Sequence, residues 1–122
     1  VYVCPGGRCA ELLHSNKGPA VRIVEPAPGT RYVPSADQLF RTAAKTLGHR
    51  AIAVVLTGMG RDGAAGVVAI AERKGQVLIE SPETAVVSGM PSAAEDTGVR
   101  HDSLPLDRLA LALSDLTTQR VK

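Results

Sequence analysis

The stretch AIAVVLTGMGRDGAAGVVAIAERKGQVLIE, residues 51–80, decides the fold. It opens with a continuous apolar run over residues 51–56, which is typical of a strand covered on both faces of a parallel sheet. A glycine-rich loop follows, then a segment of helical composition over residues 64–74 and a second apolar strand over residues 77–80. Strand, loop, helix and strand within about thirty residues predict one βαβ unit, with parallel strands and a right-handed crossover.

The flanking sequence predicts further helices and strands around this unit. Ser35 is expected to cap a helix that ends at Gly48, with the side chain of Gln38 reaching back to the Ser35 backbone N–H. The prolines between residues 26 and 34 predict a loop. The other expected elements are a strand at residues 1–3, a hairpin of residues 10–14 with 20–24, short helices at 81–87 and 91–97, a small strand near 103–104 and a terminal helix at 107–116.

The composition restricts the classes of function. With 122 residues the chain fits one domain, and its apolar fraction of 44% and charged fraction of 21% are those of ordinary globular proteins. No apolar stretch approaches the roughly 20 residues needed to cross a bilayer, so we expect a soluble, cytoplasmic protein without membrane insertion. A net charge of +2 with one Phe and two Tyr argues against nucleic-acid binding. No Cys-His cluster surrounds Cys4 and Cys9, so we expect free thiols and no metal.

The loop TGMGRDG, residues 57–63, lies where ligands gather in open parallel sheets, at the carboxyl end of a strand. Its three glycines match the G-x-G-x-x-G pattern of dinucleotide-binding proteins. Glu80, at the end of the next strand, is near the place of the acid that binds a ribose in such proteins. Against this hypothesis, the negative charge of Asp62 would lie beside the phosphates that the helix start is meant to attract.

Asp62 itself supports a different hypothesis. The amino-terminal dipole of the helix that follows the loop would stabilise its ionised carboxylate, which suits an aspartate that orients a histidine in a hydrolytic triad. Aspartate is also favoured near helix starts on structural grounds alone, so a plain capping role remains open. The residues by themselves therefore leave dinucleotide-binding, catalytic and capping roles for this loop.

Motifs along the chain carry a resemblance to a known family. PSADQLF opens the predicted helix at residues 34–40, LTGMGRDG forms the loop at residues 56–63, and VSGMP occupies residues 87–91. Residues 1–6 add a Tyr-hydrophobic-x-Pro-Gly segment. With these motifs, nearly the whole chain closely resembles the catalytic domain of the chemotaxis protein-glutamate methylesterases, the CheB family. The resemblance implies a doubly wound α/β domain with a mostly parallel sheet, in a Rossmann-like three-layer arrangement, and no cofactor.

The resemblance also implies roles for residues of the loop. The family hydrolyses glutamyl methyl esters on chemoreceptors with a Ser-His-Asp triad, and Asp62 matches the triad acid by its place in the motif. Met59 would line the mouth of the active site. The turn glycines would bring the loop back against the nucleophile's side of the site, and they are Gly58, Gly60 and Gly63.

The nucleophile and base motifs of the family belong upstream and do not occur in the chain. We therefore expect residues 1–122 to be the carboxyl-terminal portion of a methylesterase catalytic domain, and the isolated chain to be inactive. Surface positions are expected for the three histidines, His14, His49 and His101. Ser88 is expected to serve the turn before Gly-Met-Pro rather than to act as a nucleophile.

The leading hypothesis is that the complete protein hydrolyses methyl esters on methyl-accepting chemoreceptors. A receiver domain upstream is usual in the family, but the residues of this chain do not decide whether one is present. A non-catalytic binding remnant and a dinucleotide-binding module remain as alternatives. A parallel sheet that is cut short would also leave an unfinished edge, through which the chain is expected to associate with itself or with another chain.

Overall fold

The centre of the fold is a three-stranded parallel sheet, seen in a computed structural model that describes residues 1–121. Its strands, in spatial order, are β3 (Ile52–Val55), β4 (Gln76–Glu80) and β5 (Asp102–Leu104). In the parallel register, Ile52 lies beside Gln76. Helix α2 (Ala64–Glu72) connects β3 to β4, so residues 51–80 form the βαβ unit that their pattern predicts.

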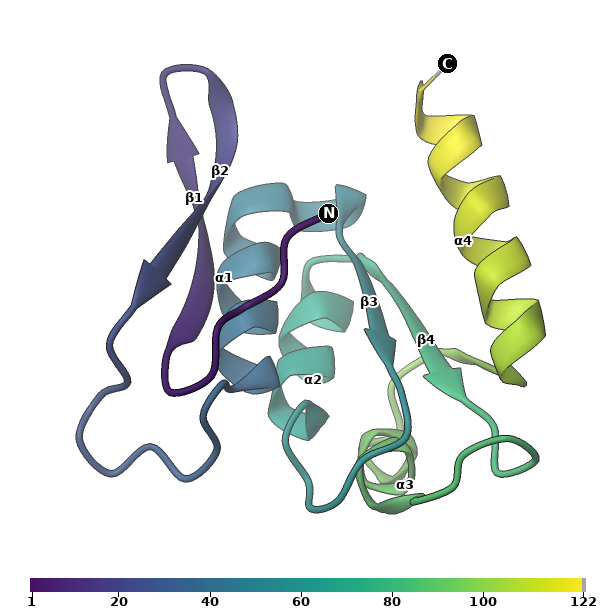
Figure 1. Ribbon diagram of the computed structural model, residues 1–122. Helices are drawn as coiled ribbons and strands as arrows, with labels where there is room; N and C mark the ends of the chain where they lie inside the picture. Colours follow the sequence, from purple (N-terminus) through teal and green to yellow (C-terminus); the bar gives the residue numbers. More distant parts are fainter. Residues whose placement is uncertain (122) are drawn as a thin grey trace.

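Helices cover both faces of the sheet (Figure 1). Helices α1 (Ala36–Leu47) and α2 lie on one face, α4 (Leu106–Val121) lies on the other, and α3 (Gly89–Asp96) lies at the end toward which β3 and β4 point. The core between the sheet and its helices includes Val67, Ile70 and Ile79. This arrangement confirms the predicted α/β class. None of the helices in the described part of the chain has the length and apolar character needed to span a bilayer.

A hairpin packs against α1 on the side away from the sheet (Figure 1). Strands β1 (Cys9–Ser15) and β2 (Gly18–Val24) pair antiparallel, which confirms the predicted hairpin. The Leu12 N–H donates to Thr42 Oγ1 at 3.0 Å, and the Thr46 hydroxyl donates to the Leu12 carbonyl at 3.1 Å. Threonine side chains of α1 thus satisfy backbone groups on the free edge of β1.

Helix α1 begins and ends as predicted, but one of its capping contacts differs. Ser35 Oγ accepts from the Gln38 N–H at 3.2 Å, and Gly48, with a φ of 57°, ends the helix. A 3-10 turn, η1 (Gly48–Arg50), follows. The side chain of Gln38 donates to Glu11 Oε2 at 2.9 Å instead of reaching back to the Ser35 N–H. That part of the prediction is wrong because β1 brings a carboxylate within reach, and hydrogen bonds to charged groups are the stronger ones.

Two other predictions about secondary structure are wrong. Residues 1–3 are exposed and form no strand, and no described strand pairs with them. Residues 81–87 form turns instead of a brief helix. A helix cannot continue through Val87, because its N–H donates to Thr57 Oγ1 at 2.8 Å and its carbonyl accepts from the Gly58 N–H at 2.9 Å.

The two faces of β3 are covered unequally. Ala53 and Val55 are each 2% exposed and belong to the core, whereas Ile52 and Val54 on the opposite face are half-buried. Leu56, directly after the strand, is 45% exposed. The expectation of a strand covered on both faces is therefore met on one face only within residues 1–121.

Candidate active site

The loop of residues 57–63 leaves β3 at the carboxyl edge of the sheet, and close contacts or the backbone conformation favour glycine at three of its positions. Gly60 and Gly63 have positive φ values of 88° and 96°. Residues other than glycine adopt such values only at a cost in free energy. A Cβ at Gly60 would lie 2.8 Å from the Tyr32 hydroxyl oxygen, and a Cβ at Gly58 would overlap the sulfur of Met90. The backbone therefore passes close to the side chains of Met90 and Tyr32, which belong to other segments.

Asp62 holds its carboxylate against the amino end of α1. The side chain is buried, with 6% exposure of the residue. Its Oδ2 accepts from the Ala36 N–H at 2.6 Å, and its Oδ1 accepts from the Asp37 N–H at 2.9 Å and from the Ser35 hydroxyl at 3.3 Å. The sequence suggested that the helix after the loop holds this carboxylate, but the N–H groups that it meets belong to α1. The positive end of the α1 dipole stabilises the negative charge there.

The amino end of α2 is held by α1 in return. Gly63, the residue before α2, has no side chain with which to cap the helix. Asp37 Oδ1 instead accepts from the Gly63 N–H at 2.9 Å and from the Gly66 N–H at 2.8 Å. The amino end of α1 thus donates to Asp62 of the loop before α2. The amino end of α2 in turn donates to Asp37 of α1.

A groove with a volume of about 420 Å³ opens beside Asp62. Most of its walls are apolar, and Met59 on its rim is 81% exposed. The lining residues are Cys4, Ala10, Tyr32, Val33, Pro34, Ser35, Ala36, Leu39, Met59, Asp62 and Met90. The groove joins the exposed segment near the amino end, the loop before α1 and the 57–63 loop. A polar carboxylate in a mostly apolar hollow is the usual composition of a small-molecule or side-chain site.

Glu80 does not face a ligand. It is 2% exposed, and its Oε1 accepts from the Thr57 N–H at 2.8 Å. The carboxylate therefore fixes the start of the 57–63 loop from inside the protein. A ribose hydroxyl cannot reach this acid, so the dinucleotide hypothesis loses the support that Glu80 gave it.

Neither the histidines nor Ser88 are among the residues that line the groove. His14 is exposed on β1, and His49 is exposed on η1. His101 Nδ1 lies 2.8 Å from the Val99 carbonyl oxygen. Ser88 is exposed and makes no capping hydrogen bond through its side chain at the start of α3. Within the described residues, the groove has no histidine among its lining residues.

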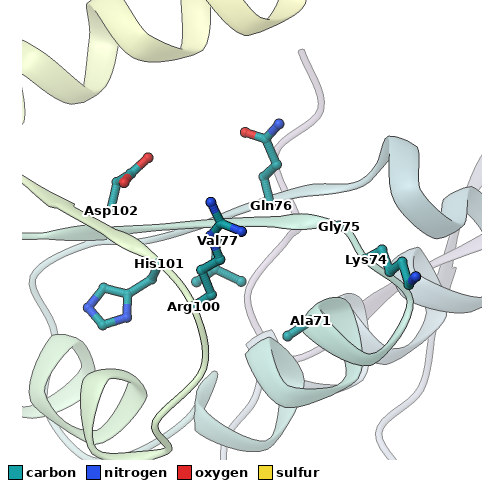
Figure 2. A pocket seen from close by; sticks show the side chains of 8 residues that line it. All are labelled: Ala71, Lys74, Gly75, Gln76, Val77, Arg100, His101 and Asp102. Atoms are coloured by element: carbon teal, nitrogen blue, oxygen red, sulfur yellow. The ribbon is translucent and has the colours of Figure 1, made fainter.

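A second cavity, of about 590 Å³, lies at the amino ends of β4 and β5, at the other end of the strands from Asp62. Figure 2 shows that Gln76 and Asp102 point to one side of the sheet, whereas His101 points to the other. The lining residues are Ala71, Lys74, Gly75, Gln76, Val77, Arg100, His101 and Asp102. Because these polar groups do not converge on one point, this cavity is the weaker candidate for catalysis.

Reasoning from sequence missed three residues that shape the groove. Ser35 and Asp37 bind the 57–63 loop, and Tyr32 lies over Gly60. The PSAD start of α1, residues 34–37, was the available signal, since it places a hydroxyl and a carboxylate at a helix start. Nothing in the sequence links that helix start to a loop that follows the next strand.

Comparison with known proteins gives the same family throughout. The family model described as CheB methylesterase matches residues 1–113. A protein-glutamate methylesterase/protein-glutamine glutaminase of Anaeromyxobacter dehalogenans is 48% identical over 115 residues, covering 91% of this chain and 33% of that protein. One of the same name from Geobacter sulfurreducens is 44% identical over 110 residues, covering 90% of this chain and 30% of that protein.

The fold agrees with a solved structure of the family. The crystal structure of the Thermotoga maritima CheB methylesterase catalytic domain is similar with a TM-score of 0.87 and 30% identity, over 94% of this chain and 61% of that chain. The predicted Rossmann-like fold is thereby confirmed. The chain spans about a third of the length of these two curated relatives. With a family match over residues 1–113 and this likeness of fold, the chain belongs to the CheB methylesterase family.

Proposed function

We propose that the protein to which this chain belongs is a protein-glutamate methylesterase of bacterial chemotaxis, which acts in the cytoplasm on methyl-accepting chemoreceptors. In this proposal Asp62 is the acid of a Ser-His-Asp triad, and residues 1–122 are the carboxyl-terminal portion of the catalytic domain. The serine and the histidine come from sequence outside residues 1–122, so the isolated chain is inactive. The observation that carries the proposal is the buried carboxylate of Asp62, anchored on α1 beside a groove at the carboxyl edge of the sheet.

The hydrogen bonds of Asp62 leave room for one further partner. An ionised carboxylate has about four acceptor positions, and Ser35, Ala36 and Asp37 use three of them. The remaining one suits the N–H of an imidazole. Because the other three bonds fix the carboxylate, it would select the tautomer of that histidine and stabilise the imidazolium formed during the reaction.

The reaction follows the general scheme of such triads. The serine oxygen attacks the ester carbonyl carbon while the histidine takes the serine proton, and the histidine then gives the proton to the departing methanol. Water attacks the acyl-enzyme in the same way and releases the glutamate side chain. The names of the relatives also include glutaminase, and a side-chain amide would react likewise with ammonia as the leaving group.

The test is Asp62→Asn in the full-length protein, assayed by methanol release from methylated receptor. We expect turnover to fall about 10³ to 10⁴-fold, because the histidine loses its preferred tautomer and the charge opposite it. We also expect a loss of stability of roughly 1–3 kcal/mol, because the new amide places an NH₂ group toward N–H donors of α1. Thermal melts of the same samples separate the two effects.

Glu80→Gln is the matched control. Glutamine can still accept from the Thr57 N–H, so the loop should stay in place and turnover should change little. The proposal is wrong if Asp62→Asn keeps near-normal turnover, or if Glu80→Gln is the more damaging change in protein that remains folded.

A further inference from the structure

We propose that Asp37 is a positioning residue for Asp62, acting through the two-way contact between α1 and the start of α2. This inference rests on the proposed function, in which Asp62 is the triad acid. Asp37 is not among the residues that line the groove, so it does not touch the substrate. Its effect on catalysis passes through the backbone that carries Asp62.

The contact consists of two sets of hydrogen bonds in opposite directions. The backbone N–H groups of Ala36 and Asp37 donate to the Asp62 carboxylate at 2.6 and 2.9 Å. The backbone N–H groups of Gly63 and Gly66 donate to Asp37 Oδ1 at 2.9 and 2.8 Å. Gly63 directly follows Asp62. The two sets of hydrogen bonds therefore both hold the turn around the peptide bond that joins Asp62 to Gly63.

Only close packing of the helices allows Asp37 to reach α2. A Cβ at Gly66 would lie 2.7 Å from the Phe40 Cβ, so glycine at this position lets α2 approach α1. Gly63 has a positive φ of 96° and no side chain to cap α2. Without the carboxylate of Asp37, the N–H groups of Gly63 and Gly66 would lose their acceptor, and the turn that carries Asp62 would be free to move.

A small movement of this turn has a large consequence for a triad. The carboxylate must meet one N–H of the histidine in a defined direction, and a misplacement of about 1 Å in such a constellation can cost on the order of 10²-fold in rate. The loss should fall on kcat, because the histidine acts in the transition state, while binding of the receptor ester in the groove is unaffected.

The experiment compares Asp37→Ala and Asp37→Asn in the full-length protein. We expect Asp37→Ala to lower kcat about 10²-fold with KM unchanged. Asp37→Asn should recover most of that loss, because both the Gly63 and the Gly66 N–H donate to Oδ1 of Asp37 and the amide oxygen can take its place. Asp107→Ala, the same change in the first turn of α4, should leave kcat unchanged. If Asp37→Ala is too unstable to assay, Asp37→Val, which also lacks an acceptor but fills more space, replaces it.

A double-mutant cycle with Asp62→Asn decides whether Asp37 acts through Asp62. If it does, Asp37→Ala causes no further loss of kcat in the Asp62→Asn background. An equal loss in both backgrounds overturns the inference, as does a normal kcat for Asp37→Ala or a failure of Asp37→Asn to recover activity. A near-normal kcat for Asp62→Asn would instead overturn the proposed function, so the two failures are distinguishable.

Discussion

At Gly60, both the backbone angle and the surrounding space require glycine. Its φ of 88° lies in the left-handed region, and a Cβ would be 2.8 Å from the Tyr32 hydroxyl oxygen. Gly98 offers a comparison, because its φ of 79° is similar and no atom lies within 4 Å of the Cβ position. Alanine at Gly98 would therefore introduce backbone strain alone, whereas alanine at Gly60 would introduce both backbone strain and steric overlap.

We expect Gly60→Ala to lower the free energy of unfolding by roughly 2–4 kcal/mol, as the sum of strain and overlap. Gly98→Ala, which has only the strain, should cost about 1 kcal/mol. Urea unfolding of the two variants in the full-length protein measures both values. Equal losses would contradict the claim that Tyr32 packs over the loop.

Asp62 combines a structural role with a place in the wall of the groove. Its carboxylate caps α1 by two backbone N–H bonds, as a helix-start aspartate would, and it lines the groove as well. The capping role that the sequence left open is therefore present. The capped helix is α1, however, and not the helix that follows the loop, α2. For this reason activity and stability must be measured separately for every variant at this position.

At the level of secondary-structure elements, Glu11 joins the hairpin to α1. Its Oε1 accepts from the Arg22 guanidinium at 2.8 Å, across the two strands, and its Oε2 accepts from the Gln38 amide at 2.9 Å. These two hydrogen bonds hold the pKa of Glu11 below its ordinary value, and the one from Arg22 has the larger effect. A lowered pKa means that the ionised carboxylate stabilises the folded state.

This contribution should depend on pH in a definite direction. It is fully present above the unfolded-state pKa and is lost as the pH falls through the lower, folded-state pKa. We expect Glu11→Gln to lower the free energy of unfolding by about 1 kcal/mol or less at neutral pH, because Arg22 is largely exposed. The difference between the variant and the parent should vanish in acid, as measured by urea unfolding over a pH series.

Glu25→Gln is the matched control for this prediction. Glu25 pairs with Arg8 at 3.1 Å, but the two side chains are 54% (Arg8) and 72% (Glu25) exposed, so water screens the pair. Its substitution should leave the unfolding curves unchanged. A pH-independent effect of Glu11→Gln would show that the glutamate acts by packing and not by its charge.

For the molecule as a whole, the sheet ends at β3 within the described residues. Strand β3 pairs with β4 on one side, and no described strand pairs with its other side. Val54 and Ile52 are half-buried on the face opposite the core, and Leu56 beyond them is 45% exposed. Unpaired backbone groups together with apolar side chains favour pairing with another strand.

We therefore predict that the isolated chain of residues 1–122 associates with itself through β3. Light scattering over a concentration series should show dimers or larger species. Val54→Lys, which places a charge beside the open edge, should shift the chain toward the monomer. Leu111→Lys, on the exposed side of α4, is the matched control and should not. A chain that stays monomeric at every concentration would contradict the prediction.

The sequence by itself determined the elements whose causes are local. The apolar run of residues 51–56, Ser35 before α1, Gly48 after it and the turn at residues 16–18 each act on neighbours a few positions away. The βαβ unit, α1 and the hairpin could therefore be predicted. The resemblance of the surrounding motif to the CheB family, and not the local pattern alone, singled out Asp62 as the candidate acid. That assignment stays a prediction until Asp62→Asn is measured.

Only the tertiary structure decided which groups meet across long stretches of chain. Asp62 caps α1, Gln38 turns to Glu11, and Glu80 is buried against Thr57. Each of these contacts joins residues more than twenty positions apart, and hydrogen-bonding groups are chosen by what packing brings within about 3 Å. Periodicity and helix-capping patterns carry no information about such partners, because they describe one segment at a time.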